Sequence, residues 1–462
     1  MRPDPSASRP QTPPDDELMD GSDTAASEAL RSIDHLFARQ FVDLTDRVCV
    51  AVGYGVSTFS FVLGDTGIVA VDSGSLPGES AAAIAELRTR TDLPILGLVY
   101  THGHPDHTGG AAAFLDENPD IEIWGIARFG DEARRFGRNG AHVARQRGLR
   151  QAGFLLPPEK RINNGIASAI YPEEGTLAQG PAGGPDPRAL PNQTFETRAT
   201  VSLGGVTLEV SYNPGETDDQ IMTWFADQRV VFAGDNMYRS FPNLYAIRGT
   251  QYRDVRDWCE SVDRIRAMQA EHLVLGHTIP FSGAAEVDRA LDVYSRGLWH
   301  VYNQTIAGMN DGKTPDELAH EVTLPPDLAA DPLLGEYYGN VSWGVRAIYS
   351  GILGWFDGDP AHMNPLHPRD RAGRVAALAG GVDVLFERAS EALAAGEAQW
   401  AAELADMVLA LGHRAHEALV LKADAVDELA YNMVTATGRN YLHTCAQELR
   451  AEAASMIEDP SS

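Results

Sequence analysis

Short apolar runs separated by Gly, Asp and Asn dominate the chain from about residue 40 to residue 285. Runs of this kind between turn residues are typical of β-strands. We expect strands at 48–55, 57–64, 67–74, 94–100, 201–212, 221–234 and 272–277. Segments 80–91 and 109–118 carry apolar residues at helical spacing. Strands that alternate with helices predict an α/β domain with stacked sheets.

The pattern changes to Ala- and Leu-rich helical spacing after about residue 285. Segments 284–309, 382–412 and 416–433 carry this spacing, with short Gly turns between helices. Such helix pairs resemble tetratricopeptide-like stacking, although no clean repeat period is present. The first residues, in contrast, are rich in Pro, Ser, Asp and Thr and nearly free of aliphatic side chains, which is typical of disorder. We therefore expect three parts: a disordered tail at 1–35, an α/β domain at 40–288 and an all-helical domain at 290–455.

Composition narrows the classes of partner. The 462 residues carry a formal net charge of −28, which argues against nucleic acid or an anionic membrane. The chain has no apolar run of about 18 residues and no apolar segment near its start that would indicate a secretory signal. Its three cysteines are widely separated, which excludes a disulfide framework and fits a reducing compartment. We therefore expect a cytoplasmic protein without an integral membrane segment.

Three histidines and one aspartate lie within six positions directly after the buried run 94–100, in the order H-G-H-P-D-H. Protonated imidazoles would repel each other in one turn, whereas neutral imidazoles and a carboxylate are what a zinc-like divalent ion prefers. His102 and His104 can reach one metal, and Asp106 and His107 can face a second. This cluster alone closes neither site, so further ligands must come from elsewhere in the chain.

Three later strand ends each present one ligand-type side chain beside a glycine. They are Glu216 in P-G-E-T, Asp235 in F-A-G-D and His277 in L-G-H. Each of these residues, taken alone, fits a capping or turn position equally well. Four such ends in one α/β domain predict together that the strand ends build a metal centre.

This set of turns resembles the metallo-β-lactamase superfamily. Glu216 stands where most members carry His, and that substitution looks like the alkyl sulfatase branch. Longer stretches also resemble this branch or its helical dimerisation domain, at 234–251, 337–365, 379–412 and 440–450. The resemblance covers about residues 45–452. It implies an αββα sandwich followed by an all-α dimerisation domain, a homodimer, and the lack of the C-terminal sterol-carrier-like domain that such sulfatases usually carry.

The resemblance also implies two Zn²⁺ ions and a ligand set. The first metal would take His102, His104 and Glu216, the second Asp106, His107 and His277, with Asp235 bridging. Asp106 and Asp235 are also the implied catalytic residues. Zinc lowers the pKa of a bound water from about 15.7 to about 7. The implied reaction is therefore hydrolysis of an alkyl sulfate ester to an alcohol and inorganic sulfate by a metal-bound hydroxide.

A sulfate monoester is an anion, so a cation outside the metal ligands should hold it. Arg248 is our candidate because its planar fork matches two sulfate oxygens, and Asn243 could donate a further hydrogen bond. The resemblance places both at the sulfate pocket. The alternatives are a structural ion pair for Arg248 and an Asx turn for Asn243. Trp343 stands where the family often has a His proposed as proton donor; it either lines the substrate pocket or belongs to the core, and Tyr338 is another possible proton source.

Two other functions stay open at this point. The same scaffold could hydrolyse a lactone, a β-lactam or a phosphoester, a reading that Trp343 and the missing C-terminal domain favour. A protein of a different class, whose helical half binds a partner, is the third possibility, and the complete set of metal ligands argues against it. The sequence gives neither the alkyl chain length nor the identity of the metal.

Overall fold

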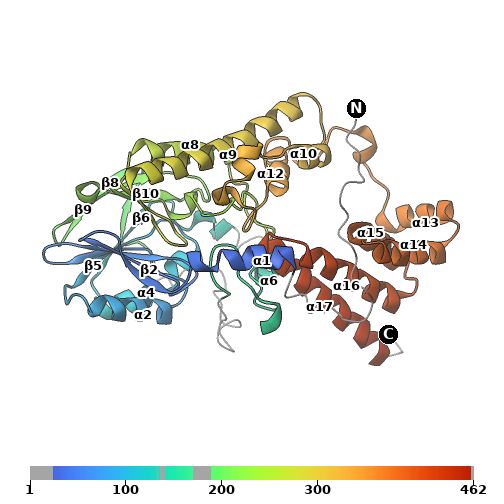
Figure 1. The fold of residues 1–462 in the computed structure, drawn as a ribbon, viewed down its shortest axis with the longest axis horizontal. Coiled ribbons are helices and arrows are strands. Elements are labelled where there is room, and N and C mark those ends of the chain that lie inside the picture. Colours follow the sequence, from blue (N-terminus) through green and yellow to red (C-terminus); the bar gives the residue numbers. More distant parts are fainter. Residues whose placement is uncertain (1–23, 133, 136–140, 170–188, 459–462) are drawn as a thin grey trace.

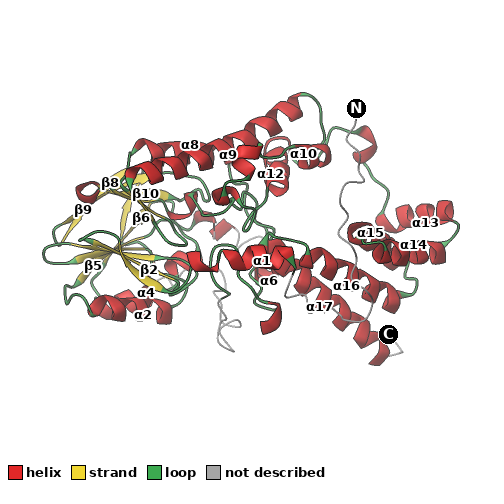
Figure 2. Cartoon of the chain, in the orientation of Figure 1, coloured by secondary structure: helices red, strands yellow, loops and turns green. Residues whose placement is uncertain are grey.

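The structure, a computed structural model, describes residues 24–132, 134–135, 141–169 and 189–458. Two β-sheets face each other at one end of the molecule (Figure 1, Figure 2). The first sheet contains, in spatial order, β1 (Gln40–Asp43), β2 (Val48–Val52), β3 (Phe59–Leu63), β4 (Ile68–Val71), β5 (Ile95–Val99), β6 (Glu122–Ile126) and β7 (Gln193–Phe195). The second contains β13 (Phe281–Ser282), β12 (His272–Val274), β11 (Val230–Phe232), β10 (Ile221–Phe225), β9 (Val206–Tyr212) and β8 (Arg198–Leu203).

Both sheets are mixed, and their inner faces share one core. Strands β4 to β7 run parallel, whereas β1 to β4 pair antiparallel. In the second sheet only β11 and β12 are parallel. Apolar side chains from both sheets, such as Phe61 and Leu98 from the first and Val210 and Phe232 from the second, belong to one buried cluster. The apolar runs of the sequence therefore become strands because each can bury its side chains between the sheets.

Helices cover the outer face of each sheet. The first sheet is covered by α2 (Pro77–Arg88) and α4 (Ala111–Glu117), and the second by α8 (Val255–Ala267) and α9 (Ala284–Asn310) (Figure 1). The layers therefore follow the order helix, sheet, sheet, helix. This arrangement confirms the αββα sandwich that the resemblance implied.

Two expected strands are shorter than the sequence pattern indicated. The expectation of one strand at 201–212 is wrong, because β8 and β9 form a hairpin whose ends pair Leu203 with Val206. Gly204 and Gly205 both have positive φ, 58° and 86°, as a two-residue hairpin turn requires. The run at 221–234 likewise contains β10 and β11, which are separated by the short helix η5 (Ala226–Gln228).

The expectation that residues 1–35 are disordered is wrong for residues 25–32, which form a helix. Helix α1 (Ala25–Ser32) begins after Thr24, whose side chain caps it and donates a hydrogen bond to the Tyr431 carbonyl oxygen (2.8 Å). Leu30 is fully buried, and its carbonyl oxygen accepts from the Asn163 side chain (2.8 Å). Contacts with distant segments therefore hold this helix, although its own sequence offers few apolar residues. Residues 1–23 lie outside the described part.

The helices that follow the second sheet do not form a separate hydrophobic core that starts at 288–290. Helix α9 spans this point, and α9 and α12 (Val341–Leu353) share a buried cluster with the second sheet. Tyr294 and Ile348 from these helices lie in the same cluster as Val231 and Leu273. An apolar helix face has the same spacing whether it covers a sheet or another helix, so spacing alone gives no sign of this shared cluster.

The remaining helices form a stack that extends away from the sheets (Figure 1). They are α13 (Pro368–Ala379), α14 (Val382–Ala394), α15 (Ala398–Ala410), α16 (Ala415–Tyr431) and α17 (Ala436–Glu458). Helix α17 packs against α6 (Ala141–Gln151). Two ion pairs support this contact region, Arg150 with Glu448 (2.8 Å) and Lys160 with Asp427 (3.0 Å). The three cysteines are free, and within the described ranges every helix is too short or too polar to cross a bilayer.

Candidate metal centre

All seven predicted ligands lie close together, in segments that follow strands of the two sheets. In the first sheet, the ligands of the H-G-H-P-D-H turn follow β5, and the last two of them lie in the short helix α3 (Pro105–Thr108). In the second sheet, Glu216 follows β9, Asp235 follows β11 and His277 follows β12. Two groups result, in each of which the potential ligand atoms lie within 4.8 Å of one another. The groups are His102, His104, Glu216 and Asp235, and Asp106, His107 and His277.

In the first group, Glu216 Oε2 lies 3.6 Å from His104 Nδ1 and 3.8 Å from His102 Nε2. Asp235 Oδ2 lies 3.8 Å from His102 Nε2. The same carboxylate also faces the second group, with Oδ1 3.3 Å from His107 Nε2 and Oδ2 3.2 Å from His277 Nε2. Asp235 therefore lies between the two groups, where a bridging ligand would have to lie.

In the second group, Asp106 Oδ2 lies 3.6 Å from His277 Nε2 and 3.7 Å from His107 Nε2. Both imidazoles are fully buried, whereas the Asp106 side chain is partly exposed. Asp106 is therefore the member of this group that faces solvent, on the side from which a substrate would have to approach.

Several buried polar atoms of these groups make no hydrogen bond to any described residue. They are Nε2 of His102, His104 and His107 and Oδ1 of Asp235. Buried polar atoms nearly always have a partner, so four unpaired Lewis bases at one place fit a binding site for a divalent cation. Gly276 keeps this space open, because a Cβ there would lie 1.9 Å from Asp235 Oδ1 and 3.0 Å from His107 Cε1. We conclude that the donor set and the space both suit metal ions.

Hydrogen bonds on the far side of the rings fix the histidines. Asp72 Oδ2 lies 2.8 Å from His107 Nδ1, and the Asp72 carboxylate also accepts from the backbone N–H and hydroxyl of Thr101 (both 2.8 Å). His277 Nδ1 lies 2.8 Å from the Val56 carbonyl oxygen. With Nδ1 donating in both rings, Nε2 carries the lone pair that a metal needs. Asp72 has a positive φ of 62°, so this orienting carboxylate is held in an uncommon backbone conformation.

Burial and neighbouring charges shift the pKa values of the imidazoles in opposite directions. Burial lowers the pKa of His102 and of His104 well below the usual value, so both are neutral and able to bind a metal. Burial also opposes protonation of His107 and His277, but the neighbouring carboxylates, Asp235 first among them, together outweigh it and raise the pKa of both. Without a bound metal, His107 and His277 therefore tend to bind a proton at the position where the metal would otherwise bind.

Two residues of the site were missed by sequence reasoning. Arg253 lies 2.8 Å from Glu216 Oε1 through its guanidinium, and both side chains are almost wholly buried. Tyr238 places its hydroxyl 2.8 Å from Asp235 Oδ2 and 3.0 Å from Glu216 Oε2. Tyr238 could have been suspected because it lies three residues after Asp235. No local pattern marks Arg253, whose place depends on how the loop after Arg248 folds back.

Asn243 and Arg248 lie on the segment between these residues. Arg253 donates a hydrogen bond to the Asn243 carbonyl oxygen (2.6 Å), which ties Asn243 to the surroundings of Glu216. The Asn243 side chain is fully buried, and its oxygen and nitrogen both lack a partner among the described residues, so no Asx turn is formed. Arg248 makes no ion pair within the described ranges. Its charge lowers the pKa of His104, an effect smaller than those of burial and of His102. Both side chains therefore remain available to a ligand.

Trp343 has a different environment from the metal ligands. It lies in the first turn of α12 and is half-buried, and its ring is 2.8 Å from the position of a Cβ at Gly438 in α17. It thus packs at the contact with the helical stack. Tyr338, the other possible proton source, has its ring 5.1 Å from that of Tyr238. Tyr338 therefore lies close to a residue that contacts the candidate metal ligands, a proximity that the sequence alone does not show.

The comparisons with known proteins agree with this fold. Residues 53–277 match the family model of the metallo-beta-lactamase superfamily, and residues 314–452 match that of alkyl sulfatase dimerisation. A linear primary-alkylsulfatase of Pseudomonas sp. (strain ATCC 19151) is 34% identical over 84% of this chain and 72% of its own length. The chain belongs to the alkyl sulfatase family of this superfamily.

Two further relatives extend the comparison. An (R)-specific secondary-alkylsulfatase of Pseudomonas sp. is 29% identical, over 86% of this chain and 60% of its own length. A structure of a double mutant of the sec-alkyl sulfatase PisA1 aligns with a TM-score of 0.81 and 25% identity, over 91% of this chain and 67% of that one. The chain thus spans between about three fifths and three quarters of the length of these relatives.

Proposed function

We propose that the chain hydrolyses alkyl sulfate esters to an alcohol and inorganic sulfate at a centre of two divalent metal ions, for which zinc is our expectation. The relatives named as alkylsulfatases support the substrate class. The observation that carries the proposal is the fully buried Asn243 amide, which has no partner among the described residues although Arg253 ties it to Glu216. An unpaired buried amide is costly unless a polar ligand completes its hydrogen bonds.

Each residue of the site has its own role in the proposed hydrolysis. When bound, the two metals would activate a water and bind oxygens of the ester. Asp235 faces both groups of histidines and Asp106 faces His107 and His277, and both carboxylates would hold the attacking water in place. Asn243 donates its amide N–H to a sulfate oxygen, and Arg248 supplies the positive charge that attracts the ester anion. The water oxygen forms a new bond as the C–O or S–O bond of the ester breaks, and the departing oxygen takes up a proton, so that the alcohol and hydrogen sulfate are released.

We also propose that the chain acts as a homodimer. The match of residues 314–452 to a dimerisation model supports this assembly. Two-fold dimers are also the commonest assembly of soluble proteins.

The function is tested by measuring released sulfate. The metal-loaded protein would be incubated with a panel of short and long, primary and secondary alkyl sulfates, with and without a chelator. We expect turnover that the chelator abolishes and that His277→Ala lowers by more than a hundredfold. His272→Ala is the matched control and should retain activity, because His272 begins β12, the strand that His277 follows, and its side chain bonds only to Ser282 among the described residues. Turnover of lactones, β-lactams or phosphoesters without any sulfate release would contradict the proposal.

A further inference from the structure

Positive charge is concentrated in one segment of a strongly acidic chain. The sequence has 37 Lys and Arg residues against 65 Asp and Glu residues. Helix α6, in contrast, carries three arginines and no acidic residue, and positions 134 and 135 add two more arginines. These five, which we call the basic segment, are Arg134, Arg135, Arg145, Arg147 and Arg150. A local excess of cations attracts small anions from solution.

The basic segment begins beside the candidate metal centre. Gly103 separates His102 from His104, and a Cβ at this glycine would lie 3.1 Å from the Gly130 backbone nitrogen. A Cβ at Gly130 would in turn lie 3.5 Å from a guanidinium nitrogen of Arg134. The His104 side chain is 18% exposed, whereas that of His102 is fully buried. The basic segment therefore starts next to a predicted ligand that reaches solvent.

Helix α6 also packs against the part of the chain that carries Arg248. The side-chain oxygen of Gln151 accepts a hydrogen bond from the Arg248 backbone N–H (3.1 Å), and a Cβ at Gly148 would lie 3.9 Å from Arg248 Cδ. Nearer to the start of the basic segment, the Glu132 carboxylate accepts from the Thr250 hydroxyl (2.8 Å). The basic segment and Arg248 thus belong to one continuous surface.

Ion pairs neutralise part of the charge on this surface. Arg150 pairs with Glu448 (2.8 Å), and Arg134 pairs with Asp131. Three arginines of the surface form no ion pair with any described residue, and they are Arg135, Arg147 and Arg248. Their three charges exceed the single charge of Glu132. The surface therefore keeps a net positive charge beside the metal centre.

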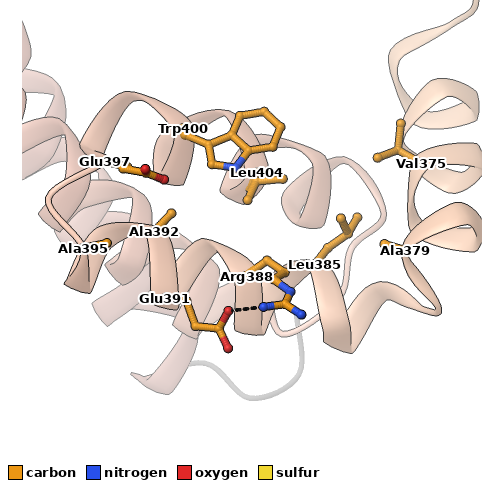
Figure 3. Close-up of a pocket in the computed structure, with 10 residues that line it drawn as sticks. All are labelled: Val375, Ala379, Leu385, Arg388, Glu391, Ala392, Ala395, Glu397, Trp400 and Leu404. Atoms are coloured by element: carbon orange, nitrogen blue, oxygen red, sulfur yellow. Dashed lines mark hydrogen bonds and ion pairs between the residues drawn. The ribbon is translucent and has the colours of Figure 1, made fainter. Parts of the chain in front are cut away.

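A groove in the helical stack has the opposite character. It has a volume of about 480 Å³, lies between α13 on one side and α14 and α15 on the other, and is lined by Val375, Leu385 and Leu404 (Figure 3). Among the described residues that line it, Arg388 is the one cation, and it pairs with Glu391 (2.5 Å; Figure 3). This groove offers an anion no unpaired positive charge, whereas the basic segment does.

We infer that Arg135, Arg147 and Arg248 draw anionic esters to the metal centre through their long-range field, and that Arg135 and Arg147 act before any contact with the substrate. This inference rests on the function proposed above and adds a basis for charge selection. A sulfate monoester is an anion and a lactone is neutral, so the field favours the first and leaves the second unaffected. The effect is largest at low ionic strength, because the Debye length is about 30 Å at 0.01 M salt and about 3 Å at 1 M.

The test is the affinity of the full, metal-loaded chain for octyl sulfonate, which has the charge of octyl sulfate but no ester bond. Titration calorimetry would measure this affinity in about 0.01 M and about 1 M salt. We expect Arg135→Glu and Arg147→Glu each to weaken binding about three- to tenfold at low salt and less than about twofold at high salt. Arg147→Lys should bind as the wild type does, because a long-range field needs the charge and not the guanidinium fork.

The matched control is Arg374→Glu, which makes the same change of net charge. Arg374 is exposed like Arg147 and lies in α13, at the far end of the helical stack from the sheets (Figure 1). This variant should change the affinity less than about twofold at either salt concentration, because the charge is too distant to act on the metal centre. Circular dichroism would verify that all four variants fold.

An undiminished affinity in both Glu variants at low salt would overturn the inference. An equal loss at high salt, or an equal loss in Arg147→Lys, would also overturn it, since either result indicates a structural role or a direct contact. A wild-type chain that does not bind the sulfonate at low salt would overturn it as well. Sulfate release from octyl sulfate is followed in parallel. Sulfonate binding with the expected salt dependence, but without any sulfate release, would contradict the proposed function and leave this inference intact.

Discussion

The guanidinium of Arg253 lies 2.8 Å from Glu216 Oε1, with the two side chains only 3% and 1% exposed. This relationship changes the charge balance of the metal centre. The carboxylates and two divalent ions would nearly neutralise each other, but a permanent cation stands directly behind one of the ligands. The centre therefore carries more positive charge toward an anionic ester than the predicted ligands alone provide.

Replacing Arg253 by Met should destabilise the metal-free protein by about 3 kcal/mol, because Glu216 loses its buried partner. Burial raises the pKa of Glu216 to about 8, so the effect should be measured near pH 9, where Glu216 is ionised. Bound metal supplies another cation, so the loss should be smaller in the loaded protein. Chemical denaturation of both forms checks this.

The control for Arg253→Met is Arg256→Met. Arg256 forms an exposed ion pair with Glu260 (3.1 Å), and such pairs contribute little to stability. Equal destabilisation by both substitutions would show that the Arg253 pair has no special role.

Tyr238→Phe should weaken metal binding about 10- to 100-fold while leaving the fold intact, as losses of outer hydrogen bonds to ligands typically do. The phenol oxygen contacts Asp235 Oδ2 and Glu216 Oε2, one ligand from the bridging position and one from the first group. Competition with a chelator of known affinity measures the change. Tyr349→Phe, which removes a hydroxyl that donates only to the Asp357 carbonyl, should bind metal as the wild type does.

Asp72→Asn should lower the affinity of the second group for metal about 10- to 100-fold. The substitution removes the charge that faces His107 Nδ1 (2.8 Å), yet asparagine tolerates the positive φ at this position. At limiting metal, elemental analysis should then find fewer ions per chain than in the wild type. Asp227→Asn, at an exposed carboxylate that pairs with Arg47, should retain the wild-type stoichiometry.

Glu79 should make stability depend on pH. Burial raises the pKa of Glu79 to about 7, although the Ser75 and Leu76 backbone N–H groups oppose the shift. Between about 4.5 and about 7 the folded state binds more protons here than the unfolded state, so this contribution to stability is present at low pH and is lost as pH rises through about 7. The free energy of unfolding of Glu79→Gln should therefore fall less over this interval than that of the wild type. Identical pH profiles would contradict this.

Asn243→Ala should lower kcat/KM for alkyl sulfates about 10- to 100-fold, which corresponds to one hydrogen bond to a charged group. Metal content should not change, because Asn243 contacts the site only through its backbone carbonyl oxygen and Arg253. Asn432→Ala, at an asparagine whose amide bonds to the Glu428 carbonyl oxygen, is the control. A change in metal content with unchanged kcat/KM would assign Asn243 to the metal site instead.

The sequence predicted which side chains come together in the candidate metal centre because their pattern is local. The density of histidines at 102–107 and the Gly-flanked ends of later strands are visible without a structure. Arg253 escaped because it reaches Glu216 through a long-range contact, and Tyr238 because a tyrosine is not rare in a loop, although it lies only three residues after Asp235. Helix α9 has ordinary helical spacing although it covers a sheet, so spacing alone gives no sign that it shares a buried cluster with the second sheet.

The two ligand groups have a consequence for how the molecule matures. Each group takes histidines from the turn after β5 and completes itself with residues that follow strands of the other sheet. A growing chain that has emerged only as far as residue 200 therefore has two members of each group and cannot complete either. Metal ions could therefore be captured only after the second sheet has docked, and bound ions would then link two layers that are synthesised at different times.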